Sequence, residues 1–155
     1  MAIGADSAIH FFGTQDEVTT SPATVVDGAF SIASDTSTWT NDDDAPMAMF
    51  RLLLTAAGLG GAPDGGTINL YAQPQNIDGS TGDQIIPSAS FFHTYLGAFP
   101  IHEADADQQI LIGPIALPNY KTSSEFIFFI ENQTGVATGT TWTLHVTPMT
   151  FGPHA

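Results

Sequence analysis

The sequence predicts an all-β protein, a single-domain β-sandwich of about seven or eight strands with an extended N-terminal arm. Short apolar stretches recur along the chain, and turn-forming residues separate them at intervals of about ten residues. No stretch shows the 3.6-residue apolar period of an amphipathic helix. The many short strands favour a jelly-roll or related Greek-key arrangement, and 155 residues are enough for one domain with its own core.

The stretch Ser124–Asn132 is expected to be the central strand. An unbroken apolar run from Phe126 to Ile130 is bounded by Glu125 and Glu131. Neighbouring side chains of a strand point to opposite faces, so this strand is apolar on both faces. Such a strand belongs in the middle of a sheet that is covered on both sides, and the two glutamates mark where it emerges into water.

Further strands are expected on either side of this one. Asp27-Gly28 lies between two short apolar runs within 24–32 and signals a two-residue hairpin, with a single bulged strand as the alternative. Gly113-Pro114 interrupts another expected strand, which indicates a bulge or a sheet edge. That strand is 110–117, and the remaining expected strands are 47–55, 67–73, 91–99 and 140–147.

Residues 1–22 are expected to form the arm, residues 23–149 the sandwich and residues 150–155 an irregular tail. The arm lacks a sustained apolar period but contains one apolar cluster, Ile9-His10-Phe11-Phe12. Unless these aromatic side chains fold onto the chain's own sheet, they are candidates for packing on a neighbouring molecule. The candidate partner contacts of the arm are Ile3, Ile9, Phe11 and Phe12.

The charge of the chain restricts its partners. One Arg and one Lys stand against sixteen acidic residues, so the formal net charge is −14. Nucleic acids and anionic membranes are bound by clustered cations, so neither is expected as a partner. A chain this acidic suits a partner with a basic surface. The sequence has no Cys for disulfides or thiolate metal sites and no recognisable secretory signal, so we expect it to fold in a cytoplasm.

Neither a cofactor nor a catalytic site is expected. Asn41 and Asp42-Asp43-Asp44 offer oxygen atoms of the kind that Ca²⁺ binds, but the spacing differs from that of an EF-hand loop. We interpret this stretch as a solvated acidic loop. The histidines lack the spacing of a zinc site, and the chain has neither a Gly-x-Ser-x-Gly elbow nor a Cys nucleophile. The sequence therefore predicts a protein that is not an enzyme.

Arg51 is a further candidate partner contact. It lies in the middle of an expected strand, between Met49 and Leu53, where an unpaired guanidinium would be costly to bury. The favoured interpretation is an ion pair within the chain, with Glu125 or Glu131. The alternative is an ion pair between subunits.

From Thr67 onward the chain contains a series of characteristic strand and turn segments. They are Ile68-Asn69-Leu70-Tyr71-Ala72, Asn76-Ile77-Asp78-Gly79, Tyr95–Pro100, Leu117–Phe126, Ile130–Gly135 and Trp142–Val146. In these segments the chain resembles a type of small structural protein that tailed bacteriophages encode. The resemblance covers about half of the chain and is a pattern of strands and turns, not a catalytic signature.

The resemblance implies a virion protein, of the decoration or cement type, on the exterior of a capsid. Proteins of this type are β-rich, often dimeric or trimeric, and extend an N-terminal arm between capsid subunits. The implied partners are the major capsid protein and copies of the chain itself, and no catalytic residue carries over. Deleting residues 1–22 is then expected to abolish capsid retention while leaving the sandwich folded.

Two other classes of function stay open. A carbohydrate-binding or receptor-binding module of a tail or fibre would use Trp39, Tyr71 and the long loop 74–90. A small hydrolase would need two acidic side chains that face each other across a pocket.

Overall fold

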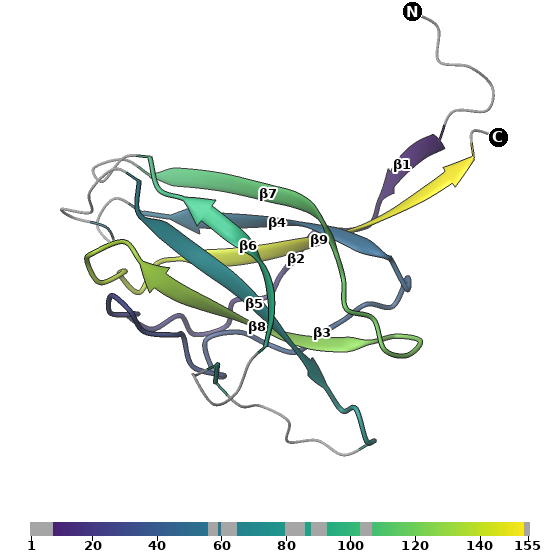
Figure 1. The fold of residues 1–155 in the computed structure, drawn as a ribbon, viewed down its shortest axis with the longest axis horizontal. Helices are drawn as coiled ribbons and strands as arrows, with labels where there is room; N and C mark the ends of the chain where they lie inside the picture. The colour runs from purple at the N-terminus through teal and green to yellow at the C-terminus, as the bar shows by residue number, and fades with distance from the viewer. Residues whose placement is uncertain are drawn as a thin grey trace, which may run out of the picture.

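The computed structural model describes residues 8–55, 59, 65–79, 86–87, 93–102 and 107–153, which form nine strands in two antiparallel sheets (Figure 1). The strands are β1 (Ala8–Phe12), β2 (Asp16–Glu17), β3 (Trp39–Thr40), β4 (Met47–Leu54), β5 (Thr67–Gln75), β6 (Thr94–Pro100), β7 (Gln108–Ala116), β8 (Glu125–Gln133) and β9 (Thr143–Pro153). The first sheet has the order β1-β9-β4-β7, with β2 also paired to β9, and the second has the order β3-β8-β5-β6.

This architecture confirms the predicted all-β, single-domain sandwich. The finer prediction, a jelly-roll or Greek-key topology, stays a prediction. Among the segments that the structure describes, none forms a helix long and apolar enough to cross a membrane.

The central strand β8 lies inside its sheet, as predicted. It pairs with β5 along its whole length and with β3 at its first residues. Its five apolar residues, 126–130, are at most 1% exposed. Phe126, Phe128 and Ile130 face the core between the sheets, whereas Phe129 points to the other face, where the His93 ring lies 5.6 Å from its ring. Both faces of the strand are therefore covered.

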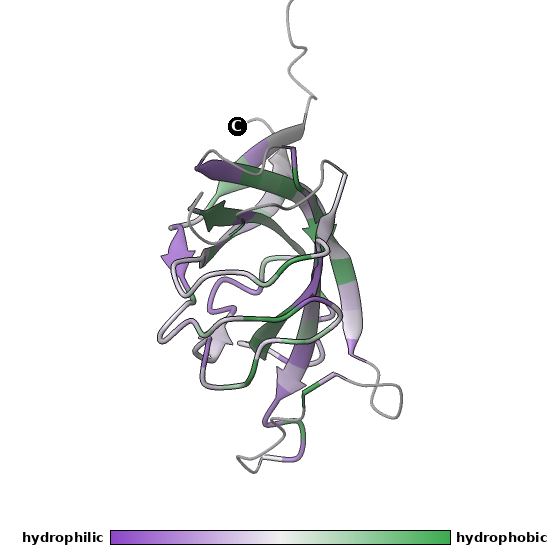
Figure 2. Ribbon diagram, turned by 90° about the vertical axis from the view of Figure 1, so that its left-hand side faces the viewer, coloured by the Kyte–Doolittle hydropathy of each residue, from purple (hydrophilic) through white to green (hydrophobic). Residues whose placement is uncertain are grey.

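The core fills the space between the two sheets. β4 alternates strictly between buried and partly exposed residues, as a strand with one face on a core must. Phe50 from β4 meets Phe128 from β8 edge to face, with the ring centroids 5.2 Å apart. Figure 2 shows the strongly hydrophobic stretches within the strands. The buried residues of the first sheet that join this cluster include Ala48, Leu52, Leu54, Ile110, Leu144 and Val146.

β7 confirms both predictions made for Gly113-Pro114. It is an edge strand, and its register against β4 shifts between Ala48 and Phe50, which places a bulge at Gly113-Pro114. Gly113 has a φ of 127°, and a Cβ there would lie 2.9 Å from Sδ of Met49. Only glycine fits this backbone conformation and this close approach.

The hairpin predicted at Asp27-Gly28 is wrong, and so is its alternative, a single bulged strand. Gly28 does turn the chain, with a φ of 76°. The flanking backbone, however, pairs with β8: the Gly28 N–H donates to the Asn132 carbonyl at 2.7 Å and the Ser31 N–H donates to the Ile130 carbonyl at 2.8 Å. The buried Asn132 side chain also donates to the Val25 carbonyl at 2.8 Å. The edge of β8 therefore takes the hydrogen bonds that a local hairpin would have used.

Candidate functional site

β1 and the C-terminal part of β9 form a two-stranded ribbon that projects from the sandwich (Figure 1). The two strands run antiparallel, from Ala8 opposite Pro153 to Phe12 opposite Met149. The irregular tail predicted for residues 150–155 is wrong up to Pro153, because β9 continues to that residue. Its hydrogen-bonding partner comes from the other end of the chain, which the local sequence does not reveal.

The ribbon carries exposed aromatic side chains on both faces. Phe12 is 60% exposed, Phe11 50% and Phe151 46%. His10 lies opposite Phe151, with their rings edge to face at 5.0 Å. Phe11 lies on the other face, against Gly152, where a Cβ would approach its Cε2 atom to 2.8 Å. Within the ribbon each strand pairs only with the other among the described strands, so much of this apolar surface stays in water.

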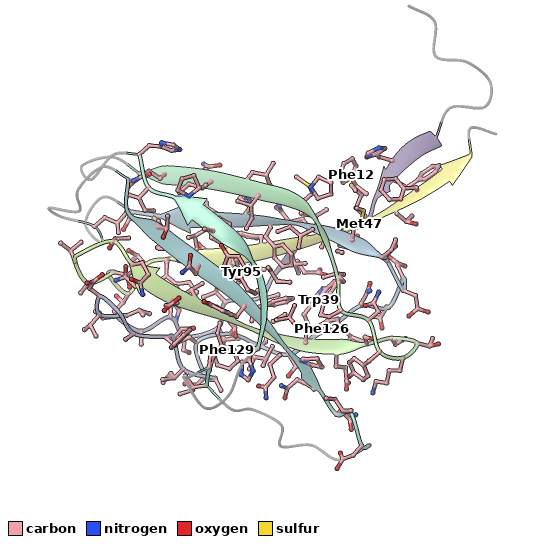
Figure 3. All side chains as sticks on the ribbon, in the orientation of Figure 1. Phe12, Trp39, Met47, Tyr95, Phe126 and Phe129 are labelled. Carbon is pink, nitrogen blue, oxygen red and sulfur yellow. The ribbon has the colours of Figure 1, made fainter. Side chains whose placement is uncertain are left out.

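One face of the ribbon continues onto the outer face of the first sheet. Phe12 is opposite Met149, and Met149 is opposite Met47 of β4. Phe12 and Met47, both labelled in Figure 3, therefore share one face on either side of Met149, whose side chain is buried. The exposed Phe12 ring is thus anchored at the base of the ribbon, where the ribbon joins the sandwich.

Two adjoining hollows lie at the base of the ribbon. The larger has a volume of about 330 Å³, and the smaller about 250 Å³. Asp43 and Pro148 line both. The larger is otherwise lined by Phe11, Phe12, Gly13, Ala45, Met149 and Thr150, and the smaller by Thr14, Asp16, Trp39, Thr40 and Asp42.

The acidic loop beside these hollows is held in place by Asn41. The buried Asn41 amide donates to the Ala45 carbonyl at 2.9 Å and accepts from the Ala45 N–H at 3.0 Å. Asp44 accepts from the Ser123 N–H at 2.6 Å. Asp42 and Asp43 are exposed, and neither forms a hydrogen bond or ion pair within the described residues. In the same part of the chain, no group of three or more His, Cys, Asp or Glu is placed to hold a metal ion.

The ion pair predicted for Arg51 with Glu125 or Glu131 is wrong. Arg51 lies on the outer face of the first sheet, whereas both glutamates belong to β8 in the second sheet. Its Nη2 donates to Oε1 of Gln15 at 3.1 Å. Glu125 instead lies 3.6 Å from the ammonium of Lys121.

His145 occupies the position between Arg51 and Glu17 on this outer face. It is opposite Arg51 on one side and opposite Glu17 on the other. Burial lowers the pKa of His145 below its usual value, and the positive charge of Arg51 lowers it further, while Glu17 acts in the opposite direction. Arg51, His145 and Glu17 thus form a polar row across the sheet, and none of them belongs to the ribbon.

The aromatic platform considered for carbohydrate binding is not formed by Trp39 and Tyr71. Trp39 is 6% exposed, stacks on Phe126 at 6.3 Å and donates from Nε1 to Oδ2 of Asp16 at 2.9 Å. Tyr71 lies on the outer face of the second sheet and donates to Oε2 of Glu131 at 3.0 Å. Burial, and then this hydrogen bond, raise the pKa of Tyr71 to about 12. Most of the loop 74–90 lies outside the described residues, and its first two residues belong to β5.

The structure brings some of the predicted partner contacts together. Phe11 and Phe12 lie on the ribbon, and the backbone of Ile9 pairs there with Gly152. Ile3 lies outside the described residues, and Arg51 lies on the sheet beyond the ribbon. Sequence reasoning missed Phe151, although Met149-Thr150-Phe151 alternates apolar and polar residues as a strand does. Prolines 148 and 153 concealed the strand, since proline is depleted in strands.

Comparisons of the chain with protein-family models, with curated proteins and with solved structures found no match.

Proposed function

We propose that this chain is a non-enzymatic structural protein of a phage virion. In this proposal it is a decoration or cement protein that binds the exterior of the capsid and holds neighbouring capsid subunits together. The single observation that carries the proposal is the projecting ribbon, whose phenylalanines are half exposed on both faces. The virion as its location rests on the resemblance of residues 67–146 described above.

The charge distribution supports docking through the ribbon. The chain has sixteen acidic residues, but β1 and β9 contain no Asp, Glu, Lys or Arg. A protein surface can therefore close over the ribbon without removing a carboxylate from water, which would be costly. An aromatic surface without charge is typical of the centre of a protein interface.

The size of the apolar surface indicates how strongly one copy binds. Burying the exposed halves of three phenylalanines removes roughly 300 Å² from water, worth about 7 kcal/mol before association costs. Those costs are about 4–15 kcal/mol, so the aromatic contact by itself gives weak attachment. Attachment of many copies to one lattice, or additional hydrogen bonds, would convert weak contacts into stable retention.

The test is co-sedimentation with empty capsids of the phage that encodes the chain. We expect saturable binding at a fixed ratio to the major capsid protein, and light scattering will show whether the chain arrives as a monomer, dimer or trimer. Absence of binding would contradict the proposal.

Substitutions will show whether the ribbon is the attachment element. The double variant Phe12→Ser with Phe151→Ser should lose capsid retention, while Ile77→Ser should keep it. Ile77 is a matched control because it is a large apolar residue, is 62% exposed and lies in the turn after β5. If both variants are retained equally on the capsid, the contact with the capsid lies elsewhere on the chain.

Truncation should remove residues 1–12 instead of 1–22. Val18 is buried in the core, and its N–H donates to the Leu144 carbonyl at 2.9 Å. Removing 1–22 would therefore also weaken the sandwich, and lost retention would not report on the arm. Removing 1–12 deletes β1 and spares β2.

A carbohydrate-binding module of a tail or fibre is the second candidate. The observation that favours it is a row of aromatic rings on the outer face of the second sheet, with Tyr71 5.5 Å from Phe30 and 5.5 Å from the exposed Tyr95. Sugars stack on such rings in many binding proteins, but here the rings meet at steep angles of 69° and 63°. A glycan array without signal above background would eliminate this candidate.

A further inference from the structure

The free edge of β1 and the larger hollow next to it together have the features of a peptide-binding groove. We infer that they bind an extended, positively charged segment of another protein, which adds to β1 as a further strand. The inference deepens the proposed function and rests on it, since it names the chemistry of the partner that the ribbon docks with. Three independent features of the described residues lead to it: an open strand edge, an apolar hollow and two unpaired carboxylates.

β1 is the terminal strand of its sheet. It pairs with β9 on one side, and no described strand pairs with it on the other. Its outward N–H and C=O groups are therefore available to an incoming strand, in the manner of β-strand addition. The opposite edge of the same sheet, β7, is interrupted by the Gly113-Pro114 bulge, and proline has no N–H to donate. β1 contains neither a proline nor a bulge.

The larger hollow offers a place for an apolar side chain of that strand. Its lining combines Phe11, Phe12 and Met149 with Gly13. A Cβ added at Gly13 would lie 2.7 Å from Cγ of Pro148 and 3.2 Å from Oδ2 of Asp43. Glycine thus lets the chain leaving β1 pass close over β9 and keeps the hollow next to the acidic loop.

The unpaired carboxylates decide the charge of the occupant. Asp43 lines both hollows and Asp42 the smaller one. A second copy of the chain would bring the same acids and a further charge of −14. It could offer only Arg51 and Lys121 in return, and Lys121 is already 3.6 Å from Glu125. Charge complementarity therefore favours a partner segment that carries Lys or Arg over a second copy.

The test uses synthetic peptides and the full chain. The probe is a fluorescent nonapeptide of alternating Lys and Val, read by fluorescence anisotropy. One control peptide alternates Glu and Val, and another is the Lys–Val peptide with alternate backbone amides methylated, so that it cannot add as a strand. We expect saturable binding of the Lys–Val peptide, roughly tenfold weaker binding after methylation and none of the Glu–Val peptide.

Charge variants locate the site. Asp42→Asn with Asp43→Asn should weaken binding of the Lys–Val peptide roughly threefold to tenfold. The matched control is Asp27→Asn with Asp107→Asn, which also removes two negative charges but at the other end of the sandwich. Asp27 accepts a hydrogen bond from the Gly135 N–H beyond the end of β8, and Asp107 directly precedes β7. This control should bind as the natural chain does. Circular dichroism and thermal unfolding confirm that both variants are folded.

Several outcomes would overturn the inference. Equal binding by the two double variants, or by the methylated and unmethylated peptides, would show general charge attraction without strand addition. If light scattering shows a dimer, and the Phe11→Ser variant is a monomer, the occupant of the β1 edge is a second copy of the chain. Capsid binding that is unaffected by Asp42→Asn with Asp43→Asn would overturn the inference while the proposed function stands. A natural chain that does not co-sediment with capsids would remove the proposed function, whatever the peptides show.

Discussion

The strand β8 and the ribbon of β1 with β9 are built from the same kinds of residue but expose them very differently. In β8 the run from Phe126 to Ile130 is at most 1% exposed, whereas in the ribbon Phe11, Phe12 and Phe151 are 46–60% exposed. β8 has a neighbour on each side and cover on both faces, while β1 has one neighbour among the described strands. The number of covering neighbours, and not residue type, separates a stabilising aromatic residue from one available for docking.

The polar groups of the two regions differ in the same way. At the end of β8, the Asn132 side chain makes four hydrogen bonds, two as donor and two as acceptor. Beside the ribbon, Asp42 and Asp43 make none within the described residues. The Asn132 side chain is thus internally satisfied, whereas Asp42 and Asp43 keep their hydrogen-bonding and ionic capacity for a partner.

The largest effect on stability is expected at the centre of β8. Phe128→Ala should lower the free energy of unfolding by about 3–5 kcal/mol, because it empties a site that is closed by Phe50 and Trp39. Chemical denaturation will measure the loss. Phe128→Leu keeps most of the volume and should lose clearly less; an equal loss would contradict the packing explanation.

A somewhat smaller loss is expected at Asn132. Asn132→Ala should cost about 2–4 kcal/mol, since it removes four side-chain hydrogen bonds and leaves the buried N–H of Thr134 without its acceptor. Denaturant unfolding of this variant is compared with that of Gln133→Ala, whose side chain is exposed. A loss at position 132 no larger than the one at position 133 would show that water replaces the amide.

A pH-dependent contribution is expected at His145. Its pKa is lowered in the folded chain, so the unfolded chain binds more protons around and below the usual value of about 6.5. The contribution of His145 to stability is therefore present above about pH 6.5 and is lost as the pH falls through the lower, folded-state pKa. Thermal unfolding of His145→Gln across this range should show a flatter pH dependence than that of the natural chain. If the unfolding temperatures of the variant and the natural chain depend on pH in the same way, the expected contribution of His145 is contradicted.

The smallest effect on stability is expected on the ribbon. Phe12→Ser should change the free energy of unfolding by no more than about 0.5 kcal/mol, because the ring is already mostly in water. The same denaturation experiment as for Phe128→Ala will measure it. A loss approaching that of Phe128→Ala would show that the ribbon is part of the core and not a docking element.

The sequence by itself determined the features that depend on local pattern. The all-β class, the interior position of β8 and the bulge at Gly113-Pro114 followed from side-chain period and from the conformations of glycine and proline. The exposed acidic loop followed from composition. These features require only neighbours along the chain, which the sequence displays directly.

The tertiary structure alone decided which distant segments meet. The arm and the tail pair as one ribbon from opposite ends of the chain, and Trp39 is buried because β3 joins the edge of β8. Arg51 is separated from Glu125 and Glu131 because β4 and β8 lie in different sheets. The turn at Gly28 serves β8 and not a hairpin. At Gly28 a backbone edge far along the chain competes with the local hairpin partner, and the contact that satisfies more hydrogen bonds and buries more apolar surface prevails.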